Sequence, residues 1–97
     1  MEVRDNPAKL RYELVDHGNV VGEILYRRDP DRIVLVHTEV APEMEGQGLA
    51  SRLVADALDD IRAKGLGVVP ICPFVRSYLR HHPGYEDLVA TDLQATD

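Results

Sequence analysis

Residues 33–72 read IVLVHTEVAPEMEGQGLASRLVADALDDIRAKGLGVVPIC, and they set the order of the fold. The run 33–40 is apolar on both faces over its first half, which is typical of a central strand covered on both sides. From Leu49 the apolar residues repeat at helical spacing, and Gly65 is placed to end that helix. The short apolar run 66–72 follows as a strand. Strand, helix and strand in this order predict a right-handed crossover between two parallel strands.

The residues before this unit indicate an antiparallel meander. Residues 10–15 alternate between apolar and polar, a turn cluster follows at 16–19, and 20–27 resumes the strand pattern. After the crossover, Pro73 suits the first turn of a further helix, which Pro83 ends. The predicted fold class is α/β (α+β): an antiparallel meander leading into a parallel βαβ unit, with helices packed on the sheet.

Length and polarity indicate one domain, 1–97, with its core at about 10–89. The polar segments 1–8 and 91–97 are expected to be loose tails.

Composition narrows the class of protein. The chain is 44% hydrophobic and 29% charged, and its formal charge of −6 with scattered Lys and Arg disfavours a nucleic-acid partner. A single cysteine excludes an internal disulfide and a multi-cysteine zinc site, and we expect no metal. The first residues lack an apolar signal region, and the longest uncharged stretch, 65–75, is too short to span a bilayer. We therefore expect a cytoplasmic protein without a membrane partner.

A ligand site is predicted where the two parallel strands end, because ligands collect outside the carboxyl ends of such strands. Thr38–Val40, the loop 45–50 and Cys72 meet at that edge. Gly46 and Gly48 let backbone N–H groups approach an anion, and they precede a helix whose first N–H groups have no intrahelical partner. A phosphate or pyrophosphate is the expected guest. The same glycines are also compatible with a plain turn into a helix.

The string Glu45-Gly46-Gln47-Gly48-Leu49-Ala50, after a strand and before a long amphipathic helix, resembles the coenzyme A motif Arg/Gln-x-x-Gly-x-Gly/Ala of the GCN5-related N-acetyltransferase (GNAT) superfamily. The wider run, with 37–40, 70–74 and 81–85, is similar to a compact single-domain branch of that superfamily from about Tyr12 to Leu88. Glu45 stands where the family usually has Arg or Gln, so backbone donors have to hold the phosphate. A tyrosine that serves the family as general acid has no clear counterpart, because Leu79 takes its place and Tyr78 lies one residue earlier.

The resemblance implies binding of acetyl-CoA (coenzyme A) and transfer of its acetyl group to an unidentified amine. It also implies where the coenzyme contacts the chain. The expected coenzyme-binding residues are Thr38, Glu39, Val40, Glu45, Gly46, Gln47, Gly48, Leu49, Ala50, Cys72, Phe74 and Arg76. Because the chain is shorter than a typical member of the superfamily, a non-catalytic acyl-CoA-binding or sensing module is the alternative, and a small interaction domain is a third. The oligomeric state is not specified by the sequence.

Three residues are candidates for catalysis. Cys72, at a strand end and before a helix N-terminus, is either a nucleophile that carries the acyl group or a buried small residue. His37 and Glu39 lie two apart on a strand and share one face, where either can accept a proton from an attacking amine. The alternative for this pair is an ordinary role within and at the edge of the sheet. His81 and His82 point apart on a helix and are expected to cap it rather than to bind metal.

Overall fold

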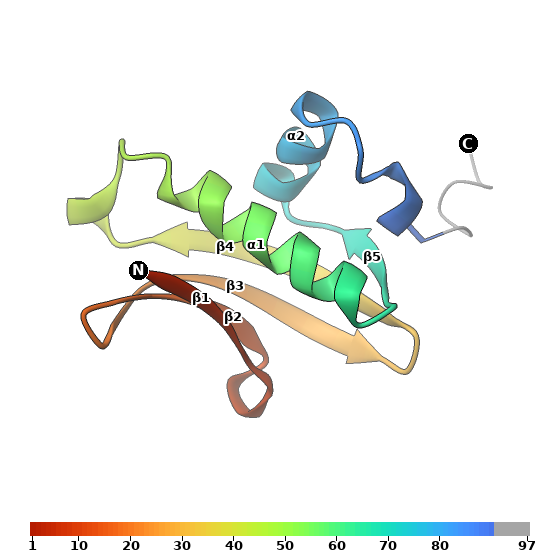
Figure 1. Ribbon diagram of the computed structural model, residues 1–97, viewed down its shortest axis with the longest axis horizontal. Helices are drawn as coiled ribbons and strands as arrows, with labels where there is room; N and C mark the ends of the chain where they lie inside the picture. The colour runs from red at the N-terminus through yellow and green to blue at the C-terminus, as the bar shows by residue number, and fades with distance from the viewer. Residues whose placement is uncertain (91–97) are drawn as a thin grey trace.

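The computed structural model describes residues 1–90, in which two helices pack on a five-stranded sheet (Figure 1). The strands follow one another in space as β1 (Glu2–Asn6), β2 (Arg11–Asp16), β3 (Asn19–Asp29), β4 (Arg32–Val40) and β5 (Gly67–Pro70). The helices are α1 (Leu49–Ala63) and α2 (Pro73–His81). Neighbouring strands are antiparallel up to β4, and β4 and β5 are parallel. The predicted fold, a meander leading into a parallel βαβ unit, is confirmed.

The expectation that residues 1–8 form a loose tail is wrong, because β1 pairs antiparallel with β2 along its whole length. Its polar character has a structural use. The carboxylate of Asp5 accepts hydrogen bonds from the Tyr26 hydroxyl at 2.5 Å and from Lys64 Nζ at 2.8 Å. These bonds fasten β1 both to β3 and to the end of α1. The predicted loose tail 91–97 lies outside the described residues.

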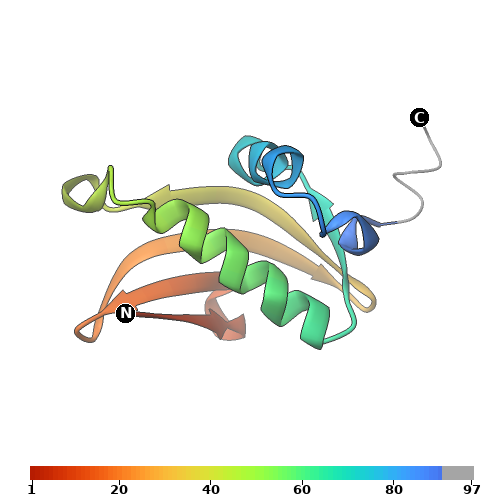
Figure 2. The ribbon, with the colours of Figure 1, turned by 45° about the horizontal axis from the view of Figure 1, so that its top comes forward.

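The core lies between α1 and one face of the sheet (Figure 2). The buried residues of α1 recur at the expected helical spacing: Leu53, Val54, Ala57, Leu58 and Ile61. They pack on Tyr12, Leu14, Ile24, Tyr26, Ile33, Leu35 and Val68 from the strands. Gly22 in β3 allows this approach, since a Cβ there would lie 3.4 Å from Leu53 Cδ2. Full burial of one such apolar side chain contributes about 1.5–3 kcal/mol, so this interface holds the fold together.

The other face of the sheet carries a buried carboxylate. Glu13 is 1% exposed and accepts hydrogen bonds from Arg4 Nε at 2.9 Å, Arg11 Nε at 2.7 Å and Asn6 Nδ2 at 3.1 Å. Desolvation by burial opposes ionisation, but the hydrogen bonds from Arg11, Arg4 and Asn6 outweigh it and lower the pKa of Glu13 to about 2. Glu13 is therefore a fully paired anion rather than a free acid.

Strand β4 lies inside the sheet, between β3 and β5, as predicted. The expectation that both of its faces are covered is wrong. Ile33 and Leu35 are buried under the helices, whereas Val34 and Val36 are only partly buried. A run of apolar residues on both faces marks an interior strand, but it does not require a second covering layer.

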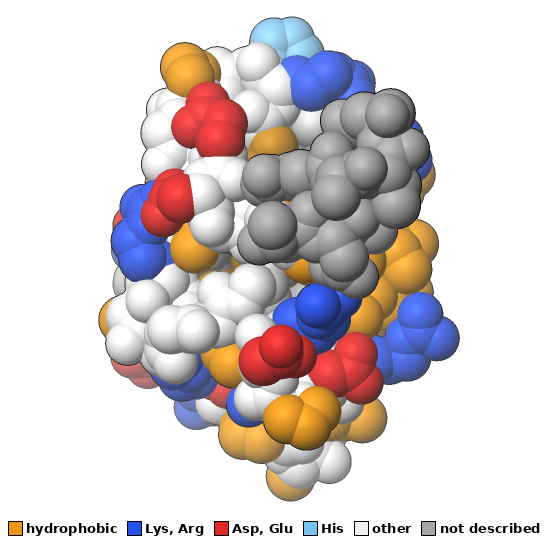
Figure 3. Space-filling view, turned by 90° about the vertical axis from the view of Figure 1, so that its right-hand side faces the viewer, with side chains coloured by type: hydrophobic (Ala, Val, Ile, Leu, Met, Phe, Trp, Pro, Cys, Tyr) orange, Lys and Arg blue, Asp and Glu red, His pale blue; other side chains and the backbone are white. Residues whose placement is uncertain are grey.

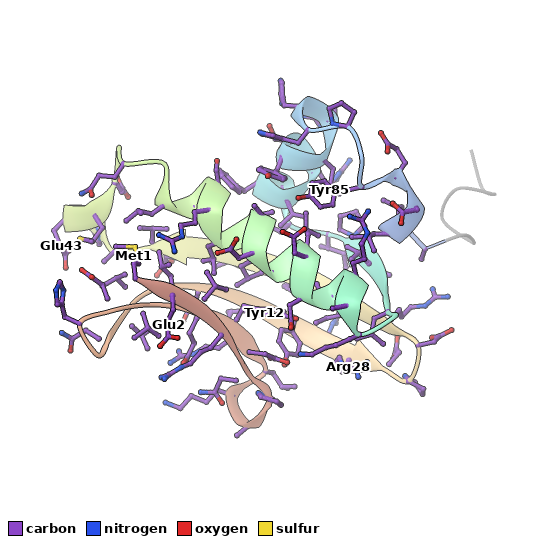
Figure 4. The ribbon with its side chains drawn as sticks, viewed as in Figure 1. Met1, Glu2, Tyr12, Arg28, Glu43 and Tyr85 are labelled. Carbon is purple, nitrogen blue, oxygen red and sulfur yellow. The ribbon has the colours of Figure 1, made fainter. Side chains whose placement is uncertain are left out.

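A second polar connection ties the sheet to α1. The Tyr12 hydroxyl, buried beneath the C-terminal half of α1 (Figure 4), donates to Asp60 Oδ2 at 2.6 Å. Lys64 Nζ contacts the same carboxylate oxygen at 2.7 Å. Burial, and then the hydrogen bond to Asp60, raise the pKa of Tyr12 above its usual range, so the phenol stays protonated.

Candidate active site

The two parallel strands diverge where the sequence places the site. Their pairing ends at Leu35 and Pro70, and the Leu35 carbonyl accepts both the Ile71 N–H at 3.1 Å and the Cys72 N–H at 2.9 Å. The chain then enters α2, while β4 continues to Val40. No described strand pairs with this last part of β4 on its β5 side. The end of β4 and the start of α2 therefore face one another without a sheet between them.

The loop after β4 leads into α1 with backbone donors free. Gly46 has φ +82° and Gly48 has φ +72°, and a Cβ built on either one would meet nothing within 4 Å. Gly48 is the N-cap of α1, and no side chain caps the helix there. The first intrahelical bond runs from Arg52 N to the Gly48 carbonyl at 3.2 Å, so the N–H groups of 49–51 precede it. Such a helix start favours an anion.

A hollow of about 180 Å³ lies against this loop, and we call it the loop hollow. Its lining consists of Val40, Met44, Glu45, Gly46, Gly48, Leu49, Ala50, Ser51 and Phe74. Most of the residues expected to bind coenzyme therefore meet in one place. Gln47 is exposed at the loop, Arg76 is exposed on α2, and neither belongs to the lining. Glu45 is the one charged side chain among the described lining residues.

A β-bulge in β4 divides the other candidates between the two faces of the sheet. Leu25 pairs with His37 and Tyr26 with Leu35, which leaves Val36 as the extra residue. Beyond the bulge, Thr38 lies opposite Ile24 and therefore on the helix face, like Val40 opposite Gly22. His37 and Glu39 lie on the other face, which we call the open face.

On the helix face, Thr38 Oγ1 and Cys72 Sγ are 3.3 Å apart, and Cys72 is 2% exposed. On the open face, His37 Nε2 lies 3.3 Å from Glu39 Oε1, and both side chains are more than half exposed, at 54% and 68%. The prediction that His37 and Glu39 share one face of the strand is confirmed. The predicted catalytic residues are thus split, with the thiol on one side of β4 and the pair of possible bases on the other.

A second hollow of about 180 Å³ adjoins the pair on the open face. It is lined by Val20, Val21, Gly22, Glu23, Glu39 and Ala41, and we call it the sheet-side hollow. A ligand in it would approach the end of β4 from the side opposite α1 and α2. The arrangement can therefore hold one partner on each face of β4.

A model of the GCN5-related N-acetyl-transferase family matches residues 11–88 of the chain. The chain belongs to this family. Among solved structures, the NMR structure of a GCN5-like protein from Staphylococcus aureus is similar, with a TM-score of 0.68 and 26% identity over 92% of this chain and 87% of that one. The crystal structure of ribosomal-protein-alanine N-acetyltransferase from Brucella melitensis biovar Abortus 2308 shares the fold, with a TM-score of 0.57 and 19% identity. That match covers 82% of this chain and 61% of the other. The resemblance noted in the sequence is confirmed.

One part of this GCN5-related domain was not expected from the sequence. A hollow of about 280 Å³ separates the start of α1 from α2, lined by Ser51, Phe74, Ser77, Tyr78, His81 and His82. We call it the helix hollow. Ser51 and Phe74 line the loop hollow as well, so the two hollows adjoin. The i, i+3, i+4, i+7 spacing of residues 74, 77, 78 and 81 was the available signal, but it equally indicates packing.

The capping role predicted for the two histidines is confirmed. His81 Nδ1 lies 2.8 Å from the Ser77 carbonyl, and His82 Nδ1 lies 3.0 Å from the Tyr78 carbonyl. Within residues 1–90, no three His, Cys, Asp or Glu side chains lie close enough to hold a metal ion. No helix in the same range is both long enough and apolar enough to cross a membrane.

Proposed function

We propose that this chain binds acetyl-CoA and transfers its acetyl group to an amine. The observation that carries the proposal is the start of α1, where two glycines at positive φ precede uncapped N–H groups at the end of β4. The coenzyme pyrophosphate would lie on the backbone of 46–50. The pantetheine arm would run along Thr38–Val40, towards Cys72. The residues fit this ligand because the space beside both glycines is open.

The open face of β4 would receive the amine. When bound, the coenzyme supplies a thioester whose carbonyl carbon is open to attack, and in either route below its carbon–sulfur bond breaks and coenzyme A leaves as the thiol. An alkylamine such as a lysine side chain has a pKa near 10.4 in water, so it must lose a proton before it can attack. Glu39, with His37 beside it, would take that proton directly or through water, which their contact on the open face supports. In a variant of this route, Cys72 first takes the acetyl group and then passes it to the amine.

A non-catalytic acyl-CoA-binding module is the second candidate, and Glu45 favours it. Its carboxylate lines the loop hollow, where an anion is expected, and weakens the field of the helix N-terminus. A chain that binds the coenzyme without catalysing transfer would tolerate this weaker anion site. Assays for acetylation of an amine panel and for coenzyme release, run beside calorimetric measurement of coenzyme binding, separate the two candidates.

The site itself is tested by Gly48→Val, with Gly65→Val as its matched control. Gly48 and Gly65 flank the two ends of α1 at φ +72° and +71°, and a Cβ at either one would meet nothing within 4 Å. Both variants therefore carry a similar backbone strain of roughly 1–2 kcal/mol. We expect Gly48→Val to abolish measurable coenzyme A affinity in calorimetry, and Gly65→Val to keep it. Equal affinity in the two variants, with helix content retained, would remove the loop from the site.

A further inference from the structure

The helix hollow has no role in the function proposed so far. Its position ties it to the coenzyme site, because Ser51 and Phe74 line both it and the loop hollow. At about 180 and 280 Å³, neither hollow alone reaches the volume of roughly 300 Å³ at which pockets for drug-sized ligands begin. Coenzyme A is larger than such a ligand. A coenzyme held at the loop therefore needs the neighbouring space as well.

The charge of α2 selects the part of the ligand that this space accepts. The helix carries Arg76, Arg80 and His81, His82 follows it directly, and it contains no acidic residue. The whole chain, in contrast, has a formal charge of −6. Figure 3 shows a histidine and Lys or Arg side chains gathered at the upper end of the molecule, where Figure 1 places α2. This end of an acidic protein favours an anion.

The capping bonds fix what the two imidazoles offer to a ligand. A backbone carbonyl only accepts hydrogen bonds, so Nδ1 of His81 and Nδ1 of His82 each carry the hydrogen that points to it. Nε2 remains available on each ring. It accepts a hydrogen bond when the ring is neutral and donates one when the ring is protonated. A dianionic group would favour the protonated rings.

The lining also offers flat apolar surface. Phe74, in the first turn of α2, is 38% exposed. The rings of Tyr78 and His82 are stacked at 3.9 Å between centroids, with 12° between their planes. An aromatic base can lie against such a surface.

We propose that the helix hollow binds the adenosine 3′-phosphate end of the coenzyme, with the adenine against Phe74 and the phosphate at Nε2 of His81 and His82. The proposal rests on the proposed function, since it extends the same ligand from the loop hollow. The chain would then recognise the 3′-phosphate, the group that distinguishes coenzyme A from its dephosphorylated precursor.

The test compares coenzyme A with 3′-dephospho-coenzyme A by calorimetry at pH 6.5. At pH 6.5 the wild-type chain should bind coenzyme A about fivefold more tightly than 3′-dephospho-coenzyme A, the effect expected of an exposed charge-assisted contact. The double variant His81→Asn, His82→Asn should lose this preference and keep its affinity for the dephosphorylated ligand. His17→Asn, in the turn between β2 and β3, is the matched control and should keep the preference.

Other outcomes overturn the inference in distinguishable ways. Equal affinity for the two ligands in the wild type, or a preference that survives the double substitution, refutes it and leaves the proposed function standing. A double variant that binds both ligands normally but has a raised KM for the amine assigns the hollow to the acceptor instead. Failure of the wild type to bind either ligand refutes the proposed function itself. Should the double variant not fold, His81→Asn alone carries the test, because His81 makes no ring stack with Tyr78.

Discussion

Two regions of this small domain differ in how their polar groups are paired: the sheet edge around β1 and β2, and the end of β4 with the loop that follows it. Around β1 and β2, Glu13 has hydrogen bonds from Arg4, Asn6 and Arg11, and the Tyr12 hydroxyl is bonded to Asp60. At the end of β4, the first turn of α1 has no side-chain cap, and the adjoining loop hollow stands open. The first region satisfies its polar groups internally, and the second leaves the first N–H groups of α1 without a side-chain cap.

The contrast shows how a GCN5-related domain of this size divides its tasks. The residues that form these hydrogen bonds and ion pairs around β1 and β2 do not line the loop hollow, so they can stabilise the fold without blocking it. Substitutions around β1 and β2 should then change stability, and substitutions in the loop before α1 should change ligand affinity.

Glu13→Gln should produce the largest loss of stability. The amide keeps the volume of the carboxylate but places a donor against the donors of Arg4 and Arg11, which costs about 2 kcal/mol of unfolding free energy. Glu39→Gln is the control, because Glu13, Glu23 and Glu39 lie side by side across the sheet and Glu39 is exposed. Urea denaturation should show a change below about 0.5 kcal/mol for that control. Coenzyme affinity should be unchanged in Glu13→Gln, and a large change would contradict the separation of the two regions.

The second largest effect should be a loss of folding stability in acid, caused by the same region. The pKa of Glu13 is about 2 in the folded chain, below the value of about 4.3 for a free glutamate. Its contribution to stability is fully present above the unfolded-state pKa and is lost as pH falls from about 4.5 towards 2. Urea midpoints measured between pH 5 and pH 3 should fall less steeply for Glu13→Gln than for the wild type. Parallel curves would show that other carboxylates govern acid unfolding.

Cys72→Ala should have a smaller effect and decides the role of the thiol. Because Cys72 is buried and its sulfur lies beside Thr38 Oγ1, we expect coenzyme binding and turnover to stay near normal, with a stability loss of about 1 kcal/mol. Mass spectrometry after incubation with acetyl-CoA provides the opposing result. One hydroxylamine-labile acetyl group, formed as fast as turnover and absent from the variant, would make Cys72 an acyl carrier.

Glu45→Arg should give the smallest change, and in the favourable direction. Replacing the carboxylate in the loop hollow by a guanidinium should tighten coenzyme binding about threefold at low salt, since an exposed pair contributes less than about 1 kcal/mol. The gain should shrink as salt is raised. Glu43→Arg, on the exposed turn before the loop (Figure 4), adds the same charge outside the lining and serves as control. Weaker binding by Glu45→Arg would assign Glu45 a positive role on the acceptor side.

Much of the fold could be predicted because its signals are local. The helical spacing from Leu53 to Ile61 and the positive-φ positions at Gly48 and Gly65 follow from short stretches of sequence. The half-buried alternation expected for 10–15 is wrong, because Glu13 and Val15 are buried as well as Tyr12 and Leu14. The loop hollow could be predicted too, because the end of β4, the glycines and the start of the next helix are close along the chain.

The remaining features depend on contacts between distant residues. Strand β1 is polar because its partners are polar: Asp5 faces Tyr26 and Lys64, which no local pattern connects to it. The split of Cys72 from His37 and Glu39 depends on the register between β3 and β4. The helix hollow depends on how α2 packs beside Ser51, whereas residue spacing describes only one of its two walls.

The bulge at Val36 has a consequence for how this family can vary. Successive side chains of a strand point to opposite faces of the sheet, and one added residue exchanges the faces of all the residues that follow it. Here Ile33 and Leu35 share a face with Thr38 and Val40 only because Val36 shifts the count. Deleting Val36 would remove the bulge and leave Thr38 and Val40 towards the helices, because Leu35 and His37 would then be consecutive residues opposite Tyr26 and Leu25. Losing the bulge while keeping Val36 would instead turn Thr38 and Val40 away from the helices and carry His37 and Glu39 towards them. Substitutions along this strand can therefore accumulate one at a time, while a change that straightens the strand and keeps its length exchanges its two faces in one step.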